Sequence, residues 1–265
     1  QGGTSTATVT VDVAPVADAP VLAGVDGAGL PVGPDQNLGE PVNNHINDFG
    51  AIMVALPDGG YAVTWASERD GDRDVYTQVF NADGTARGSE HRVSDPTDNN
   101  ASDLPKSVAA LADGGYVVTW VSEVDGDGDA VARIYNADGT PRTAELNVSD
   151  PVDNNSEDVP TSVVALAGGG YAVTWVTNRN GDQDIYTRVY DANWAGISHV
   201  KYFIDTADNG VNDNFNIVTA LSGGGYAVTW YAERDGDGDV FTRTYDADGT
   251  PSGPERNASD DTDND

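Results

Sequence analysis

The sequence predicts an all-β protein built from tandem four-stranded antiparallel units of 55 residues, arranged like the blades of a β-propeller. A motif of the form Gly-Gly-Tyr-x-Val-Thr-Trp occurs four times, and no segment has the apolar period of an amphipathic helix. The constant spacing means that loops as well as strands keep their lengths from unit to unit. The tryptophans of the four motifs, each 55 residues from the next, are Trp65, Trp120, Trp175 and Trp230.

The first two strands of a unit flank a glycine-rich turn. In the second unit a small aliphatic strand covers residues 107–111, and the turn Asp-Gly-Gly covers 113–115. The next strand alternates, so Tyr116, Val118 and Trp120 lie on one face. Aromatic residues at this spacing usually fill protein interiors, so we expect these columns to form the core.

The last two strands of a unit follow an acidic loop. The third strand, residues 74–80 in the first unit, is rich in β-branched and aromatic residues. It ends in Ala-Asp-Gly-Thr at 82–85, a hairpin turn that uses glycine at positive φ. A weaker fourth strand, such as residues 145–148, leads into an acidic connection. Four antiparallel strands per unit favour a propeller blade, and a β-sandwich or a β-solenoid array of the same units is the alternative.

The repeat also sets the expected domain boundaries. Residues 30–56 align with 85–111 without a gap, and residues 260–265 stop inside an acidic connection. We therefore expect four full units and part of a fifth within a repeat domain at 23–265, preceded by a terminal strand and linker at 1–22. The missing strands are expected outside this sequence or from a neighbouring chain.

The charge balance excludes several classes of partner. The chain has 44 acidic and 13 basic residues, a net charge of -31 and no cysteine. Nucleic acids and anionic membranes require clustered Lys and Arg, so neither is an expected partner. No apolar run approaches the roughly 20 residues that span a bilayer, so membrane insertion is not expected either. Cations are the natural counterpart of this chain.

The loop after each Trp strand places an oxygen-bearing side chain at every second position. Calcium takes six to eight oxygen ligands, and an Asp-x-Asp-x-Asp run supplies three carboxylates from one short loop. In the third unit Asn178 and Asn180 replace two of the acids, so this unit should bind most weakly. The alternative is a solvated acidic surface without a discrete site. The predicted calcium ligands are Glu68, Asp70, Asp72, Asp74, Glu123, Asp125, Asp127, Asp129, Asp182, Asp184, Glu233, Asp235, Asp237 and Asp239, together with Asp18 near the amino terminus.

Strand parity brings two kinds of acidic loop together. In an up-and-down sheet, the loop after the second strand and the connection after the fourth strand leave from the same edge. Most of the acidic residues would then crowd one edge and destabilise the fold by mutual repulsion. Bound cations would reverse that effect, because a ligand that binds only the folded state stabilises it.

The amino-terminal segment carries a family resemblance. Residues 4–13 alternate between small polar and apolar side chains, and Pro15-Val-Ala-Asp-Ala-Pro-Val21 follows. This segment resembles the last strand and linker of the cadherin-like repeats of giant bacterial secreted proteins. The units at 30–265 are similar to repeats that accompany such domains in the hemolysin-type, repeats-in-toxin class. The resemblance implies secretion to the cell surface, folding in calcium outside the cell, and adhesion.

Catalysis has little support in the sequence. The three histidines fall at different positions of the repeat, and acids that recur fourfold are typical of structural ligands rather than of one active site. The chain is therefore predicted not to be an enzyme. Residues 193–204 break the repeat with several aromatic residues, which indicate either a thicker fourth strand or a sugar- or protein-binding patch. The candidate ligand-binding residues of this patch are Trp194, His199 and Tyr202.

The sequence thus favours a non-catalytic, calcium-stabilised structural or adhesive module of a secreted bacterial surface protein. Two alternatives remain, a lectin-like carbohydrate-binding propeller and a subunit of an extracellular filament assembled by strand exchange. Besides calcium, the expected partners are surface glycans or further copies of the chain.

Overall fold

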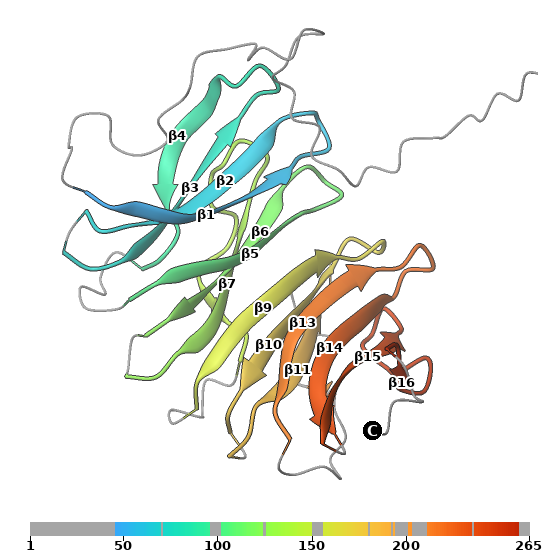
Figure 1. The fold of residues 1–265 in the computed structure, drawn as a ribbon. Coiled ribbons are helices and arrows are strands. Elements are labelled where there is room, and N and C mark those ends of the chain that lie inside the picture. Colours follow the sequence, from blue (N-terminus) through green and yellow to red (C-terminus); the bar gives the residue numbers. More distant parts are fainter. Residues whose placement is uncertain are drawn as a thin grey trace, which may run out of the picture.

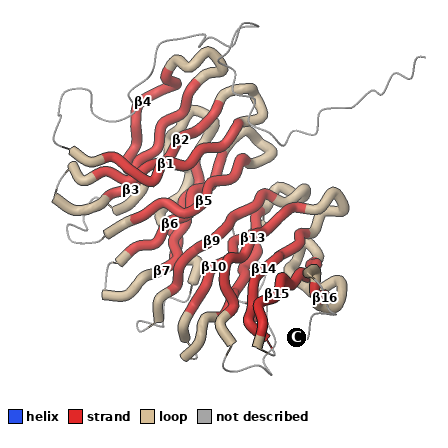
Figure 2. The backbone as a smooth tube through the Cα atoms, viewed as in Figure 1, coloured by secondary structure: helices blue, strands red, loops and turns tan. Residues whose placement is uncertain are grey.

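The computed structural model shows an all-β protein, and its described residues contain sixteen strands and no helix (Figures 1 and 2). Without a helix, these residues hold no helical segment that could cross a membrane. The predicted linker at 1–22 lies outside the described part of the chain. The described residues are 46–69, 71–95, 102–123, 126–149, 156–179, 181–191, 193, 201–202, 211–234 and 236–259.

The strands form four sheets, each an antiparallel meander of four consecutive strands. This confirms the predicted fold class. The first sheet holds β1 (Asp48–Ala55), β2 (Tyr61–Ser67), β3 (Asp74–Phe80) and β4 (Ala86–Arg92); the second holds β5 (Leu104–Ala110), β6 (Tyr116–Ser122), β7 (Asp129–Tyr135) and β8 (Leu146–Asn147). The third holds β9 (Asp158–Ala165), β10 (Tyr171–Thr177), β11 (Asp184–Tyr190) and β12 (Lys201–Tyr202); the fourth holds β13 (Asp213–Ala220), β14 (Tyr226–Arg234), β15 (Asp237–Tyr245) and β16 (Arg256–Asn257).

The four sheets stand side by side along an arc, in the order of the chain (Figure 1). The first strand of each sheet lies next to the first strand of the following sheet, so β5 contacts both β1 and β9, and β9 contacts β13. A sheet that packs on its neighbours through both faces, with its first strand on the inside, is the arrangement of a propeller blade.

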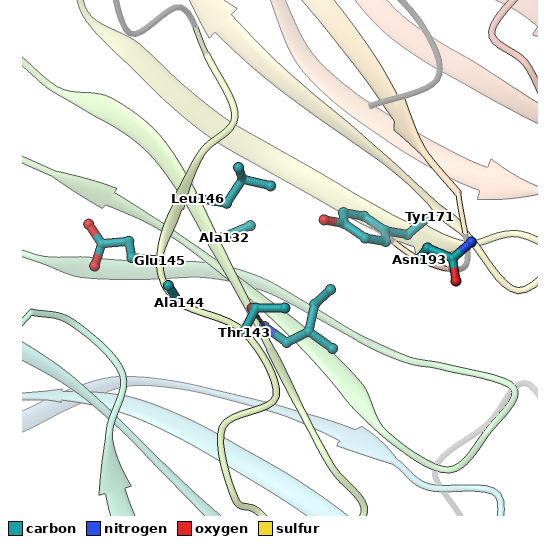
Figure 3. A pocket seen from close by; sticks show the side chains of 8 residues that line it. Ala132, Thr143, Ala144, Glu145, Leu146, Tyr171 and Asn193 are labelled. Atoms are coloured by element: carbon teal, nitrogen blue, oxygen red, sulfur yellow. Dashed lines mark hydrogen bonds between the residues drawn. The ribbon is translucent and has the colours of Figure 1, made fainter. Parts of the chain in front are cut away.

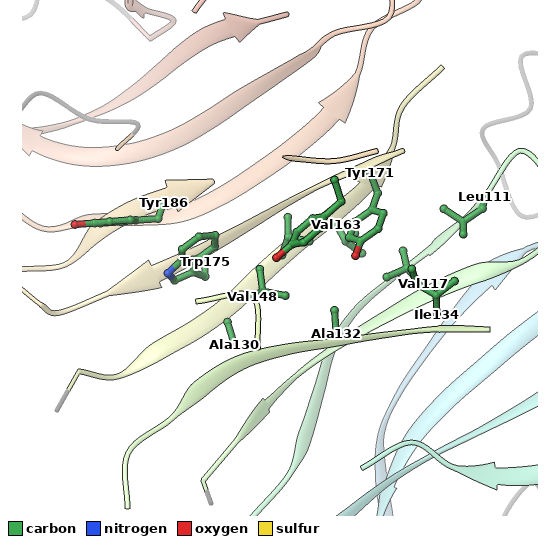
Figure 4. Close-up of a cluster of buried hydrophobic side chains, with 12 residues drawn as sticks. Leu111, Val117, Ala130, Ala132, Ile134, Val148, Val163, Tyr171, Trp175 and Tyr186 are labelled. Atoms are coloured by element: carbon green, nitrogen blue, oxygen red, sulfur yellow. The ribbon is translucent and has the colours of Figure 1, made fainter. Parts of the chain in front are cut away.

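Each sheet has two different faces. The leading face packs on the preceding sheet and carries the Tyr, Val and Trp of the second strand, which are Tyr171, Val173 and Trp175 in the third sheet. The trailing face carries the residues that alternate with them and packs on the following sheet; in the second sheet these include Val117 and Ile134. Figure 4 shows this cluster between the second and third sheets. The predicted aromatic core is therefore confirmed.

Two serines tie the inner strands together across the sheets. Ser107 Oγ accepts a hydrogen bond from the backbone N–H of Val163 (3.1 Å), and Ser162 Oγ accepts one from the N–H of Val218 (3.4 Å). Both serines lie beside a β-bulge, where one extra residue of the inner strand faces the tryptophan strand. The bulge turns each serine towards the next sheet, a detail that strand periodicity does not predict.

The Gly-Gly turns keep their second glycine because of a close approach. A Cβ on Gly115 would collide with the backbone oxygen of Tyr135 on the adjacent strand. Asp113, the residue before the two glycines, stabilises the turn. Its side chain accepts a hydrogen bond from the Gly115 N–H (3.0 Å) and forms an ion pair with Arg142 (2.5 Å). The first sheet repeats this ion pair between Asp58 and Arg87.

Candidate functional site

The two kinds of acidic loop meet at one edge of the sheets, as strand parity predicts. The connection that enters each new sheet hydrogen bonds to the loop that follows the second strand of the preceding sheet. The Asp103 N–H donates to the Arg73 carbonyl (2.9 Å), and the Asp213 N–H donates to the Gln183 carbonyl (2.7 Å). The side chains of the acids that open β5, β9 and β13 are buried, and the sequence analysis did not single them out as ligands; they are Asp103, Asp158 and Asp213.

The aspartate that opens the third strand of a sheet has a structural partner. Asp74 Oδ1 accepts a hydrogen bond from Ser94 Oγ (3.3 Å), and this Oγ accepts one from the backbone N–H of Val75 (3.3 Å). The arrangement therefore fixes the fourth strand and its connection onto the start of the third strand. It recurs in the second and fourth sheets, as Asp129 with Ser149 and Asp239 with Ser259.

The environment of Asp74, one of the predicted ligands, strongly perturbs its pKa. Its side chain is 1% exposed and forms an ion pair with Arg92. Burial raises the pKa of Asp74 from its ordinary value of 3.8 to about 6, the Arg92 guanidinium opposes this shift, and the carboxylates of Asp72 and Asp103 add to it. Carboxyl groups from two successive sheets thus act on Asp74 at this junction.

The described residues contain no cluster of three or more acidic or histidine side chains that is placed to hold a metal ion. Several predicted ligands have other partners: Glu68 binds Arg73 (3.1 Å) and Asn47 (2.9 Å). The hydrogen bonds from Asn47 and Arg73 lower the pKa of Glu68. The Oδ2 atoms of Asp72 and Asp74 are buried without a hydrogen-bond partner, so the two residues are suitable calcium ligands. The calcium site remains a prediction.

The other predicted ligands fall into three groups. Glu233, Asp237 and Asp239 were expected in a loop, but they lie on the strands β14 and β15, whose pairing extends to Arg234 and Asp237. A second group comprises Glu123, Asp127, Asp129, Asp182 and Asp184, which flank or open the third strands of the second and third sheets. Asp18, Asp70, Asp125, Asp235, Trp194 and His199 lie outside the described residues, and Tyr202 is described only as a backbone position in β12.

A break in the repeat creates a second candidate site between the second and third sheets. In the second and fourth sheets, the tyrosine that begins the second strand lies within hydrogen-bond distance of a threonine in the third strand of the preceding sheet. Tyr116 Oη lies 3.0 Å from Thr77 Oγ1, and Tyr226 Oη lies 3.4 Å from Thr187 Oγ1. In the third sheet the corresponding tyrosine is Tyr171, and the position that the threonine takes in the other pairs is occupied by Ala132. Tyr171 Oη is buried and has no hydrogen-bond partner in the structure. Aligning the repeats would have revealed this exception.

A cleft of about 270 Å³ lies at this break (Figure 3). Its inner wall is formed by Ala132, Ile134 and the Tyr171 side chain, which points from the third sheet towards the second. The other lining residues come from the segment between β7 and β8, from the first residue of β8 and from the turn after β11. They are Thr143, Ala144, Glu145, Leu146 and Asn193.

The cleft combines an apolar wall with a few polar groups, as small-molecule sites usually do. Tyr171 stacks on Tyr190 with ring centroids 4.8 Å apart, which fixes the ring. Burial raises the pKa of Tyr171, so its hydroxyl is neutral at physiological pH and can donate a hydrogen bond. Glu145 supplies a carboxylate 3.9 Å from Arg133, and Thr143 Oγ1 accepts the N–H of Ile134 (3.1 Å).

No family model and no curated protein matches this sequence. Several solved structures share its fold. An alpha-L-arabinanase of Penicillium chrysogenum, complexed with arabinobiose, is 15% identical with a TM-score of 0.55, and the match covers 79% of this chain and 66% of that chain. An alpha-L-arabinofuranosidase of Fusarium graminearum is 12% identical (TM-score 0.50; 81% and 67% covered), and the Hadza microbial sialidase Hz136 is 12% identical (TM-score 0.51; 74% and 44% covered).

These likenesses confirm the propeller-like fold and correct two functional predictions. The prediction of a non-catalytic adhesive module is wrong, and so is the prediction that the chain is not an enzyme, because the similar propellers are glycoside hydrolases. The predicted alternative, a carbohydrate-binding propeller, agrees with them better. The chain spans 66% of the arabinanase and 44% of the sialidase, and the identities of 12–15% show the fold alone.

Proposed function

We propose that the protein is a carbohydrate-binding propeller and that the cleft between the second and third sheets holds a sugar residue. The observation that carries the proposal is the break at Ala132, which leaves the Tyr171 hydroxyl without a partner beside a cleft lined by Thr143 and Glu145. A sugar ring has apolar faces and hydroxyl groups around its edge. Its apolar face can pack on the apolar wall of the cleft while its hydroxyl groups bind the polar side chains that line the cleft.

The size and charge of the cleft limit the ligand. Its volume of about 270 Å³ is just below the usual range of ligand pockets, roughly 300–1,000 Å³, so it suits one sugar residue at the end of a longer chain. Glu145 lines the cleft and the whole chain carries a net charge of -31. Both repel anions, so a neutral or amino sugar is the expected ligand and an acidic sugar is not.

Tyr171 forms part of the inner wall of the cleft, and the residue is 0% exposed to solvent. Its hydroxyl can reach a ligand only where the small Ala132 side chain leaves space that a threonine fills in the other pairs. A buried hydroxyl without a partner loses stabilisation that a ligand hydroxyl or a water would restore. Removing the Tyr171 hydroxyl should therefore weaken binding without damaging the fold.

The test is a binding titration with neutral oligosaccharides, arabinobiose among them, followed by the variants Tyr171→Phe, Glu145→Gln and Ala132→Thr. We expect each variant to bind at least about tenfold more weakly, the effect of losing one good hydrogen bond in a desolvated site. Tyr116→Phe is the matched control, because it removes the equivalent hydroxyl at a place where Thr77 already supplies its partner. Sugar binding that survives all three cleft variants would contradict the proposal.

The same oligosaccharides can be used to test whether the protein is an enzyme. Analysis of the products after a long incubation with the protein shows whether any glycosidic bond is cleaved. Hydrolysis that disappears in Glu145→Gln would make the cleft an active site, since glycoside hydrolysis requires a carboxyl group beside the scissile bond. Hydrolysis that persists in this variant would place the reaction elsewhere in the chain.

We also propose calcium as a ligand of the acidic edge. The support is the junction of the first two sheets, where the carboxylates of Asp72 and Asp103 act on Asp74 and the Oδ2 atoms of Asp72 and Asp74 are buried without hydrogen bonds. A cation there would replace the missing partners and offset the repulsion.

A further inference from the structure

The inner end of the cleft between the second and third sheets is small. Ala132, Ile134 and the Tyr171 side chain form its inner wall, and we call the space beside these three residues the recess. They are only 1%, 2% and 0% exposed, so the recess has room for a small group only. A sugar ring would lie farther out, beside the half-buried Leu146 and the exposed Ala144, and a substituent about as large as a methyl group would enter the recess.

The recess lies where the repeat lacks an oxygen and a methyl group. Thr77, Thr187 and Thr242 occupy the equivalent of Ala132 in the other three sheets. Threonine carries one oxygen and one methyl group on the same carbon atom, and alanine has neither. At Thr77 and Thr187 this oxygen lies 3.0 and 3.4 Å from the tyrosine hydroxyl of the next sheet. A ligand that replaced the missing group would supply an oxygen and a methyl group from one carbon atom.

The oxygen that enters the recess should be a hydrogen-bond acceptor. The Tyr171 hydroxyl points towards Ala132 and Leu146 (Figure 3), and it is buried without a hydrogen-bond partner. Because burial raises the pKa of Tyr171, its hydroxyl keeps the proton and can donate it. A carbonyl oxygen of the ligand would accept this proton and remove the cost of an unsatisfied buried group.

Beside this acceptor the ligand should carry a donor. Glu145 lines the same cleft, and its carboxylate accepts hydrogen bonds but donates none. A carboxylate has about four lone-pair sites, so Glu145 can accept a ligand N–H while it keeps its ion pair with Arg133 at 3.9 Å. Thr143 Oγ1 accepts the N–H of Ile134 (3.1 Å), and its own proton can be donated to a hydroxyl oxygen of the ring.

We propose that the cleft binds the acetamido group of an N-acetylated amino sugar. This assignment rests on the sugar site proposed above and narrows its ligands to one class. The acetyl oxygen accepts a hydrogen bond from Tyr171, the acetyl methyl group fills the recess beside Ala132 and Ile134, and the amide N–H donates to Glu145. An acetamido group is neutral and carries an acceptor, a donor and a methyl group within a few bonds of one another.

Other substituents on the sugar match fewer of these residues. A hydroxyl group, as in glucose, brings no methyl group into the recess. A free ammonium group pairs with Glu145, but it leaves Tyr171 without an acceptor and loses its water beside Ala132 and Ile134. A carboxylate accepts the Tyr171 proton but is repelled by Glu145. The N-acetyl sugar should therefore bind most tightly.

The test compares three methyl glycosides that differ only at carbon 2, those of N-acetylglucosamine, glucosamine and glucose, together with the same three in the galacto series. Saturation-transfer NMR measures their binding to the whole chain. Salt at about 0.5 M screens the attraction between the glucosamine cation and a chain with a net charge of -31. In at least one series we expect the N-acetyl glycoside to bind about tenfold more tightly than the other two, the combined effect of one hydrogen bond and one buried methyl group. Its acetyl methyl protons should receive the most saturation.

The other results would contradict the assignment in distinguishable ways. Equal binding of the glucose and N-acetyl glycosides would overturn the acetamido contact and leave the sugar site standing. Tighter binding of the glucosamine glycoside would also overturn it, since Glu145 would then recognise an ammonium group. Saturation that is strongest on the ring protons would place the ring in the recess instead of the methyl group. If none of the glycosides binds, the assignment fails, and the titration with arabinobiose shows whether the sugar site fails with it.

Two variants of the inner wall locate the acetyl group. Ala132→Val restores the shape of threonine without its hydroxyl, so it should fill the recess and reduce the affinity for the N-acetyl glycoside to that for the glucose glycoside. Thr187→Val, which makes the corresponding change in the next sheet, is the matched control and should leave the preference unchanged. A preference for the N-acetyl glycoside that survives in a folded Ala132→Val protein would overturn the assignment.

The second variant enlarges the recess and does not depend on the first. Val79 takes the equivalent of Ile134 in the first sheet, so Ile134→Val places a residue there that the repeat already uses. The variant should shift the preference from the N-acetyl towards the N-propionyl glycoside by about fourfold, the effect of one additional buried methylene group. An unchanged ratio of the two affinities would place the acyl group outside the recess and contradict the assignment.

Discussion

At the scale of single residues, the repeat allows each side chain to be compared with its equivalents in the other sheets. These equivalents stand at the same backbone position, so the differences identify the positions that have lost an interaction. Ala132 is such a position, since threonines occupy the equivalent places Thr77 and Thr187. A comparison within one chain is not affected by differences in solvent or crystal environment.

Ala132→Thr should stabilise the protein. The new hydroxyl would give Tyr171 Oη the partner that Tyr116 has in Thr77, at 3.0 Å. We expect the free energy of unfolding to rise by about 1 kcal/mol, the usual net contribution of a buried hydrogen bond. Denaturant unfolding measures it, and Thr77→Ala should show the opposite change. A loss of stability in Ala132→Thr would mean that the cleft is too tight for the added atoms.

Asp74 should make stability depend on pH in an unusual direction. Because its pKa in the folded state, about 6, exceeds the ordinary value of 3.8, the protonated form favours folding. Its contribution is therefore greatest at low pH and is lost as the pH rises through 6. In calcium-free buffer, Asp74→Asn should gain stability relative to the native chain between pH 4 and pH 7 in denaturant titrations. A stability difference that stays constant over this range would contradict the assignment, which also involves Arg92, Ser94, Asp72 and Asp103.

At the scale of elements, the sequence predicts the strong strands and misses the local irregularities. The Tyr-x-Val-Thr-Trp strands and the third strands have clear alternation, and the structure confirms them with a regular register in all four sheets. In the second and fourth sheets the fourth strand is only two residues long, and two residues of it are described in the third sheet. The bulges of the inner strands and the long hairpin of β14 and β15 depend on tertiary contacts and were not predicted.

The glycines of the turns differ in what they require. Gly115→Ala should destabilise the protein by about 1–3 kcal/mol, because the added Cβ collides with the Tyr135 carbonyl oxygen and one of the two strands must shift. Gly223→Ala is the control in an equivalent turn, since a Cβ there meets nothing within 4 Å. Thermal unfolding of the two variants gives the comparison. Equal losses of stability would show that chain flexibility, and not the close approach, explains the conserved pair of glycines within this repeat.

At the scale of the whole molecule, the sequence predicts the architecture better than the function. Four identical spacings are enough to predict four similar sheets, because each unit must bury its aromatic face on a neighbour. The site could not be predicted in the same way. The cleft depends on one missing hydroxyl at Ala132, which the period of the strands does not reveal.

Calcium should stabilise the molecule as a whole if it binds the acidic edge. We expect millimolar calcium to raise the melting temperature by several degrees and a chelator to reverse the shift. Magnesium, which prefers a smaller octahedral site, should have less effect. Asp72→Asn should reduce the calcium-dependent shift more than Asp182→Asn, because the third unit carries two Asn in place of acids. An identical melting temperature with calcium and with chelator at low ionic strength would refute the prediction.

The position of the fourth sheet has a consequence for how the molecule comes apart. Within the described residues, the second sheet packs on neighbouring sheets through both faces, whereas the fourth sheet packs on the third sheet through one face. In a linear array of similar units, such an end frays first, before the central units lose their structure. Amide hydrogens around Trp230 should therefore exchange faster than those around Trp120 when this chain is studied by itself.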